Sequence, residues 1–192
     1  MLICGVRRKV RSEHLHLEVP WRLSALQRAT TIIVPGIYPI DRPVSEELIR
    51  VLQRAIARGA RVASIYSGPF VLARTGALNG LRATTHSLAA QELARRHPEI
   101  DVNPDVLYVD NGKILTSAYA AAGLDLCLHI VRRDLGAEIA APTARLVVMP
   151  LERAGGQARS LFTNPRLSTT TPRSVRCRFG SKRISAKISR CV

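Results

Sequence analysis

Two short apolar runs frame the first part of the chain. Residues 31–36 read TIIVPG and residues 61–66 read RVASIY, and both runs lead into turn-forming residues. Continuous apolar runs of this length, without polar alternation, are typical of parallel strands that are buried on both faces. We therefore predict two fully buried parallel strands.

A helical pattern separates the two runs. Ser45 is suited to the N-cap, and Glu46 and Glu47 follow in the first turn, where carboxylates are favoured by the helix dipole. Gly59 can end the helix as a C′ glycine. The residues expected to face the core share one helical stripe: Leu48, Val51, Leu52 and Ile56.

Strands and helices continue to alternate after residue 66. Pro69 suits the start of a short helix, and a second strand-to-helix passage begins at residues 83–87, with Leu88 and Leu93 expected to point inward. Residues 106–117 contain Asn111-Gly112, which predicts a hairpin with a type I′ turn.

Two apolar helices are expected next, over residues 120–133 and within residues 136–148. This order of elements predicts an α/β fold, a flavodoxin-like three-layer sandwich with a mostly parallel sheet. In such sheets ligands bind beyond the carboxyl ends of the strands. The ends to consider are Gly36, Tyr66 and the turn at residues 84–86.

Helical periodicity ends near residue 155. From Gln157 onward the chain has nine basic residues and no acidic one, which accounts for most of the formal net charge of +15. We predict a domain over residues 1–155 and a basic, disordered tail over residues 156–192. The alternative is that this tail binds nucleic acid, since clustered basic residues attract polyanions.

Several classes of protein do not fit the sequence. The four cysteines show no C-x-x-C spacing, and the histidines are scattered apart from His14 and His16, so we expect no metal and no cofactor. No apolar run is long enough for a membrane span. The first residues place their basic side chains after a short apolar run, the reverse of a secretory signal, which indicates a cytoplasmic protein.

The stretch ASIYSGP, residues 63–69, carries the most specific signal. A buried strand turns there into a helix, and Ser67 and Gly68 supply the small side chains that a crowded turn requires. Many enzymes mount a nucleophile at such an elbow. The residue at the apex of this elbow is Tyr66.

Five segments together resemble a known domain. They are VPG (34–36), ASIYSGPFVLARTGALNGLRATTH (63–86), ILTSA (114–118), AGLDLCLHIVRRDLGAEIA (122–140) and GGQA (155–158). In this order they resemble the PfpI-type, class I glutamine amidotransferase-like domain, and more narrowly the version at the N-terminus of AraC-type transcription regulators. The resemblance covers residues 30–158.

The chain departs from that family pattern in three respects. The resemblance implies a cysteine at the elbow with a histidine downstream; His86 matches the histidine, but Tyr66 replaces the cysteine. The opening strand that the family fold implies is expected to be missing. The two helix-turn-helix units that follow in AraC-type regulators are replaced by the basic tail.

The replacement at the elbow argues against catalysis. A tyrosine and a histidine differ by about 3.5 in reference pKa, so deprotonation of the phenol by His86 would cost about 4.8 kcal/mol. Cys127, within an apolar helix, is better explained as a small core residue than as a substitute nucleophile. We expect a binding site formed by five residues: Gly36, Tyr66, Ser67, His86 and Tyr119.

These observations predict a non-catalytic, ligand-sensing and dimerisation domain of an AraC-type regulator, which lacks its DNA-binding part. It is expected to form a homodimer, and an unknown small-molecule effector is expected to bind over the elbow and shift the geometry of that dimer. One alternative is a PfpI-type enzyme, such as a hydrolase, a hydratase or a glyoxalase-like protein. Another is a truncated or frame-shifted product, since the composition changes abruptly near residue 160.

Overall fold

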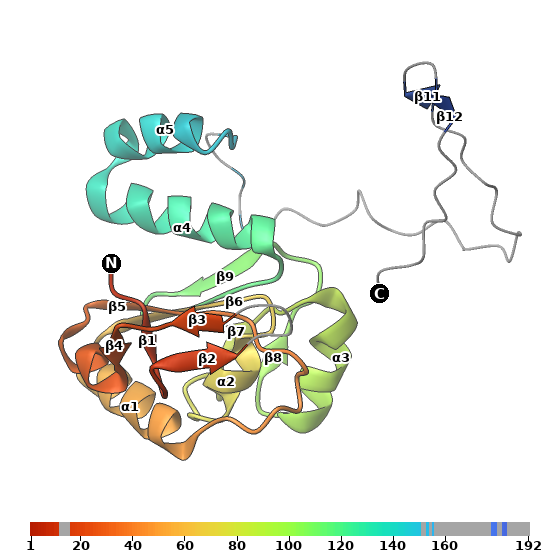
Figure 1. Cartoon of the computed structure of the whole chain (residues 1–192). Coiled ribbons are helices and arrows are strands. Elements are labelled where there is room, and N and C mark those ends of the chain that lie inside the picture. The colour runs from red at the N-terminus through yellow and green to blue at the C-terminus, as the bar shows by residue number, and fades with distance from the viewer. Residues whose placement is uncertain (12–15, 151–152, 154, 156–177, 180–181, 184–192) are drawn as a thin grey trace, which may run out of the picture. The chain divides into compact units, whose positions relative to one another are not determined.

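The computed structural model describes residues 1–11, 16–150, 153, 155, 178–179 and 182–183 (Figure 1). The chain divides into two units, Met1–Ser160 and Leu161–Val192. The predicted tail lies almost entirely outside the described residues. Its described part is a pair of antiparallel strands, β11 (Arg178–Phe179) and β12 (Lys182–Arg183).

A four-stranded sheet organises the described part of the first unit. Its order is β5 (Thr31–Val34), β6 (Arg61–Ile65), β10 (Ile114–Ser117) and β9 (Tyr108–Asn111). The first three strands are parallel, with Val62 opposite both Ile32 and Ile114, and β9 is antiparallel to β10. The predicted mostly parallel sheet is confirmed.

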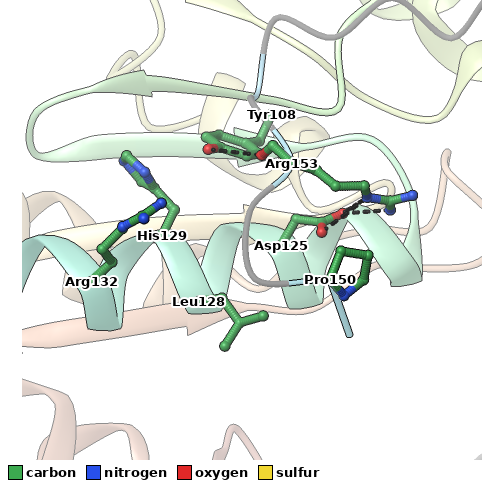
Figure 2. A pocket seen from close by; sticks show the side chains of 7 residues that line it. All are labelled: Tyr108, Asp125, Leu128, His129, Arg132, Pro150 and Arg153. Carbon is green, nitrogen blue, oxygen red and sulfur yellow. Dashed lines mark hydrogen bonds and ion pairs between the residues drawn. The ribbon is translucent and has the colours of Figure 1, made fainter. Parts of the chain in front are cut away.

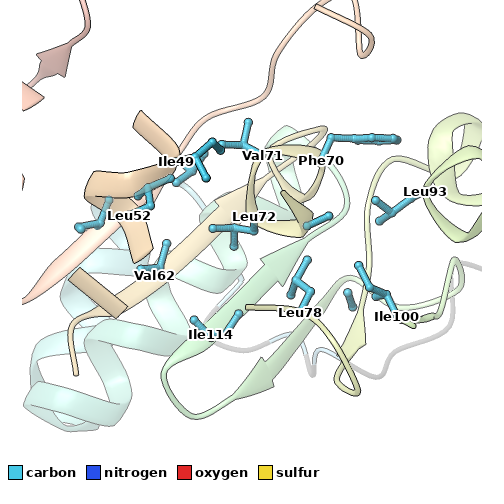
Figure 3. Close-up of a cluster of buried hydrophobic side chains, with 14 of the residues drawn as sticks. Ile49, Leu52, Val62, Phe70, Val71, Leu72, Leu78, Leu93, Ile100 and Ile114 are labelled. Carbon is cyan, nitrogen blue, oxygen red and sulfur yellow. The ribbon is translucent and has the colours of Figure 1, made fainter. Parts of the chain in front are cut away.

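One face of the sheet is covered by three helices: α1 (Glu46–Ala57), α2 (Pro69–Ala73) and α3 (Ser87–Arg96). Their buried side chains form the main core with Ile32, Val62 and Ile114 of the sheet. Figure 3 shows this cluster, in which Leu52 of α1 and Leu72 of α2 lie near the strands and are fully buried. Aliphatic side chains dominate this core.

The other face is covered by α4 (Ala120–Leu135), which packs on β6, β9 and β10. Leu126 contacts a second, smaller core that contains Ala63 and Leu115. Helix α5 (Ala137–Leu146) follows after Gly136 and packs on α4 (Figure 1). Helices on both faces of the sheet make the predicted three-layer arrangement.

The ends of α1 follow the sequence signals in part. Ser45 occupies the N-cap position, but its side chain makes no capping hydrogen bond. At the other end the N–H of Gly59 donates to the carbonyl of Ile56 and that of Ala60 to the carbonyl of Ala55. With Gly59 at φ +88°, these bonds form a Schellman motif, so the C′ glycine is confirmed.

The first unit also contains three pairs of short strands that are separate from the four-stranded sheet. Near the start, β1 (Cys4–Gly5) pairs with β4 (Trp21–Arg22), and β2 (Lys9–Arg11) pairs with β3 (His16–Glu18). A 3-10 helix, η1 (Leu23–Arg28), leads into β5. Farther along, β7 (Arg82–Ala83) pairs with β8 (Asp101–Val102).

Three details of the sequence prediction are wrong. Ile33 of β5 is exposed, because α4 covers the strands beside β5, so this edge strand is buried on one face only. In α3, Leu88 is 88% exposed, while Ala89, Ala90 and Leu93 face the core. In the hairpin, Asn111 pairs with Ile114, so the turn residues are Gly112 and Lys113; Gly112 has φ +81° but Lys113 does not have a positive φ, so the turn is not type I′.

Part of the α1 stripe also differs from the prediction. Leu52 is buried as expected, and Leu48 and Ile56 are partly buried against the core. The helix is rotated so that Ile49 and Ala55 are buried as well, whereas Val51 is only partly buried. The error amounts to a small rotation about the helix axis.

Candidate functional site

The elbow at Tyr66 adopts the strained geometry that its sequence predicts. Strand β6 ends at Ile65, Tyr66 has φ +61°, and α2 begins at Pro69. A bulky residue rarely adopts this left-handed conformation, and such strain persists only where the surroundings enforce it.

Hydrogen bonds from two neighbouring segments hold the backbone of Tyr66. Its N–H donates to the carbonyl of Ser117 at 3.0 Å. Its carbonyl accepts the Thr85 hydroxyl at 2.7 Å and the N–H of His86 at 3.3 Å. The end of β10 and the start of α3 therefore fix the elbow from both sides.

Gly68 allows the chain to turn at this point. A Cβ atom there would lie 2.7 Å from the carbonyl oxygen of Val34 and 3.0 Å from that of Ile65. Both neighbours are backbone atoms of strands, which cannot move aside as a flexible side chain can. Gly68 has ordinary helical angles (φ −56°, ψ −29°), so its backbone conformation does not require glycine. The close approach of the two carbonyl oxygens does.

Ser67 ties the elbow to the loop after β5. Its hydroxyl donates to the carbonyl of Ile37 at 2.6 Å and accepts the N–H of Ile37 at 2.8 Å. A Cβ atom on Gly36 would lie 3.0 Å from the Tyr66 ring and 3.1 Å from Ser67 Oγ, so that loop passes close to the elbow. Ser67 is buried and positions the loop.

Aromatic side chains gather above the elbow. The His86 ring lies 4.7 Å from the ring of Tyr66 and 4.8 Å from that of Tyr119, the second contact being edge-to-face. The Tyr119 hydroxyl is 2.7 Å from the Ser87 hydroxyl. Tyr66 is 38% exposed, so its ring is accessible from solvent. The structure thus brings together all five residues expected at the site; that they bind a ligand stays a prediction.

The described cysteines do not supply the chemistry that the elbow lacks. Cys127 lies within α4 and is half-buried, and burial raises the pKa of its thiol. Burial likewise raises the pKa of Cys4, in β1. Both shifts disfavour the reactive thiolate. The described residues contain no group of three or more His, Cys, Asp or Glu side chains that could hold a metal ion.

A separate pocket lies over α4, and none of the five expected residues lines it (Figure 2). The carboxylate of Asp125, whose side chain is only 2% exposed, pairs there with Arg153, which donates at 2.6 Å from Nη2 and 3.1 Å from Nε. This pairing raises the pKa of Arg153. The sequence offered one signal for it: an aspartate among apolar residues in AGLDLCL (122–128).

A polar cluster borders the same pocket. His129 Nε2 lies 2.6 Å from Asp110 Oδ2, and Arg133 donates to both carboxylate oxygens of Asp110 at 2.8 and 3.1 Å. Burial of Asp110 opposes its ionisation, but the bonds from His129 and the Gly112 N–H and the charge of Arg133 outweigh it and lower its pKa. These contacts fasten the β9–β10 hairpin to α4.

The sequence pattern of the DJ-1/PfpI family matches residues 8–133, and the chain belongs to this family. Among curated proteins it is 29% identical to the HTH-type transcriptional regulator CdhR of Pseudomonas aeruginosa over 139 residues, 72% of this chain and 39% of that protein. It is 34% identical to an isonitrile hydratase of Pseudomonas putida over 124 residues, 64% of this chain and 51% of that enzyme.

Solved structures show the same fold. An AraC family transcriptional regulator from Pseudomonas putida superimposes with a TM-score of 0.64 at 21% identity, covering 75% of this chain and 78% of that one. Drosophila melanogaster DJ-1beta gives a TM-score of 0.64 at 19% identity, with 74% and 78% covered. The chain matches about two fifths of the length of the curated regulator named above.

Proposed function

We propose that this chain is a non-catalytic, ligand-sensing domain of an AraC-type transcription regulator, with a small-molecule effector bound over the elbow. The observation that carries the proposal is the phenol of Tyr66 at the apex of a strained strand-to-helix turn, in contact with His86. The left-handed backbone of Tyr66 costs conformational energy, and strain of this kind is typical of functional sites. The ring of Tyr66 can recognise an effector through its face and through its hydroxyl.

Similarity to transcription regulators supports the regulatory half of the proposal. CdhR and two other Pseudomonas aeruginosa regulators, GbdR and ArgR, match 61–72% of this chain. The match covers 32–39% of each regulator's length. Sensing and DNA binding can therefore belong to different parts of such proteins. Among the described residues, no helix combines the length and apolarity needed to cross a membrane.

Thermal unfolding of the full chain against a library of small metabolites tests the proposal. A ligand present at 100 times its Kd should stabilise the fold by about 2.7 kcal/mol, which raises Tm by about 5–10 °C. Tyr66→Ala should abolish that shift. Tyr108→Phe, a change to a tyrosine that lines the other pocket, should keep it. A shift that is the same in Tyr66→Ala would place the ligand elsewhere and contradict the proposal.

The second candidate function is a PfpI-type enzyme, which the similarity to an isonitrile hydratase favours. Tyr66 argues against it, because a phenol is a much weaker nucleophile at neutral pH than a thiolate. One assay distinguishes the two functions: isonitrile hydration is measured with the unmodified chain and with Tyr66→Cys. Turnover by the unmodified chain would favour the enzyme.

A further inference from the structure

The first 30 residues carry most of the excess positive charge of residues 1–156. They contain six basic and two acidic residues, whereas residues 31–156 contain 14 basic and 12 acidic ones. Three of the basic residues are consecutive and exposed: Arg7, Arg8 and Lys9. Within the described part of the chain, Arg7 and Arg8 have no ion-pair partner. Lys9 lies 3.7 Å from Glu18, an exposed pair that water screens.

These residues lead into a two-stranded ribbon that stands at the surface (Figure 1). Strands β2 and β3 pair in antiparallel fashion, with Lys9 opposite Glu18, and every residue of β3 is exposed. The N–H of Val19 donates to the carbonyl of Arg8 at 2.7 Å, which joins the chain after β3 to the chain before β2. A ribbon of two strands has little stability of its own, so a ribbon exposed in this way suggests a role other than packing.

The two faces of the ribbon differ in chemistry. Successive residues of a strand point to opposite faces, so Lys9 and Glu18 lie on one face and Val10 and Leu17 lie on the other. Val10 is 37% exposed and Leu17 is 55% exposed, and neither belongs to the two cores of the unit. A surface that binds an anionic bilayer presents basic and apolar side chains on one side. The ribbon separates Lys9 from its two apolar side chains, which favours nucleic acid over a membrane as its polyanionic partner.

The shape of the ribbon also fits a nucleic-acid duplex. The major groove of B-DNA is about 12 Å wide and admits a two-stranded β-ribbon. Exposed arginine and lysine side chains bind the phosphates beside the groove and release counterions. Trp21 lies three residues after β3 and is 49% exposed, so an aromatic side chain stands close to the ribbon.

We propose that the β2–β3 ribbon, together with Arg7 and Arg8, is a contact surface for double-stranded DNA. The ribbon lies in the major groove, and Arg7, Arg8 and Lys9 bind phosphates. Phosphate contacts position a protein on the duplex without reading its sequence, so this surface adds affinity and not specificity. The contact belongs to the first unit, does not involve the basic residues after Gln157, and is independent of the ligand proposed at Tyr66.

Titration of the full chain with a short DNA duplex of random sequence tests the proposal. Trp21 is the single tryptophan of the chain, so its fluorescence reports on this surface, and the duplex should change its emission. Binding is measured between about 50 and 200 mM salt. The variant Arg7→Gln/Arg8→Gln should bind at least about tenfold more weakly at the lower salt concentration. The slope of log K against log salt should fall by about 2, since two phosphate contacts are lost.

Matched controls separate this surface from general charge. Arg50→Gln/Arg54→Gln removes two exposed arginines from α1, and it should keep the fluorescence response and a steeper salt slope than Arg7→Gln/Arg8→Gln. A single-stranded oligonucleotide of the same length and vesicles that contain phosphatidylserine should each bind at least about tenfold more weakly than the duplex. The urea midpoint of Arg7→Gln/Arg8→Gln should equal that of wild type, because both side chains are exposed.

Three results would overturn the proposal: Trp21 emission that does not respond to the duplex, a salt slope that is unchanged in Arg7→Gln/Arg8→Gln, or a single strand or vesicle that binds as tightly as the duplex. The sensing proposal is tested separately. A thermal shift with a metabolite that persists in Arg7→Gln/Arg8→Gln would support sensing at Tyr66 whether or not the ribbon binds DNA.

Discussion

Replacing Arg153 with leucine should lower the free energy of unfolding by about 3 kcal/mol, because it leaves the Asp125 carboxylate buried without its counter-charge. Urea unfolding followed by circular dichroism measures the loss. Adding Asp125→Asn to the leucine variant should recover part of the stability, because that change removes the buried charge.

The matched control is Arg95→Leu. Arg95 also pairs with a carboxylate, that of Glu92, at 2.7 Å, but its side chain lies largely in solvent. Water replaces an exposed partner at little cost, so this variant should unfold close to wild type. Equal losses in the two leucine variants would show that the burial of Asp125 contributes nothing.

Gly68→Ala should destabilise the chain by about 3 kcal/mol, because the added methyl group would overlap the carbonyl oxygen of Val34. Alanine is otherwise favoured over glycine at helical backbone angles, so any loss reports on the close contacts with the backbone of Val34 and Ile65. Relief of the overlap would push β5 away from the elbow, and the Ser67–Ile37 hydrogen bonds would lengthen.

Gly80→Ala provides the comparison. A Cβ atom at Gly80 meets nothing within 4 Å, but its φ is +72°. That variant should lose about 1 kcal/mol from backbone conformation alone. A Gly68→Ala variant no less stable than Gly80→Ala would mean that the elbow is not closely packed.

The central strands and the elbow could be predicted because their signals are local. A β-branched run, a C′ glycine at position 59 and small residues after Tyr66 each constrain the few residues beside them. The residues around Tyr66 could be predicted as well, because parallel strands place their carboxyl ends at one edge of the sheet. Gly36 and His86 could therefore be expected near the elbow from the order of elements alone.

Features that depend on distant packing were missed. Leu88 looked like a core residue, but the rotation of α3 buries the alanines after it instead. Ile33 belongs to an unbroken apolar run, and only the position of α4 shows that one face of β5 is bare. Asp110 and Asp125 find their partners 19 and 28 residues away along the chain, which no local pattern encodes.

The left-handed backbone at position 66 has a consequence for engineering. Glycine would relieve that conformation, and a stability screen that samples this position should recover it among the improved variants. Such a variant would keep the turn, because the N–H of residue 66 still donates to the Ser117 carbonyl and its carbonyl still accepts the Thr85 hydroxyl. It would, however, present only backbone atoms to an effector at this position. Selection for heat resistance should therefore favour glycine at position 66, whereas selection for response to the effector should favour tyrosine.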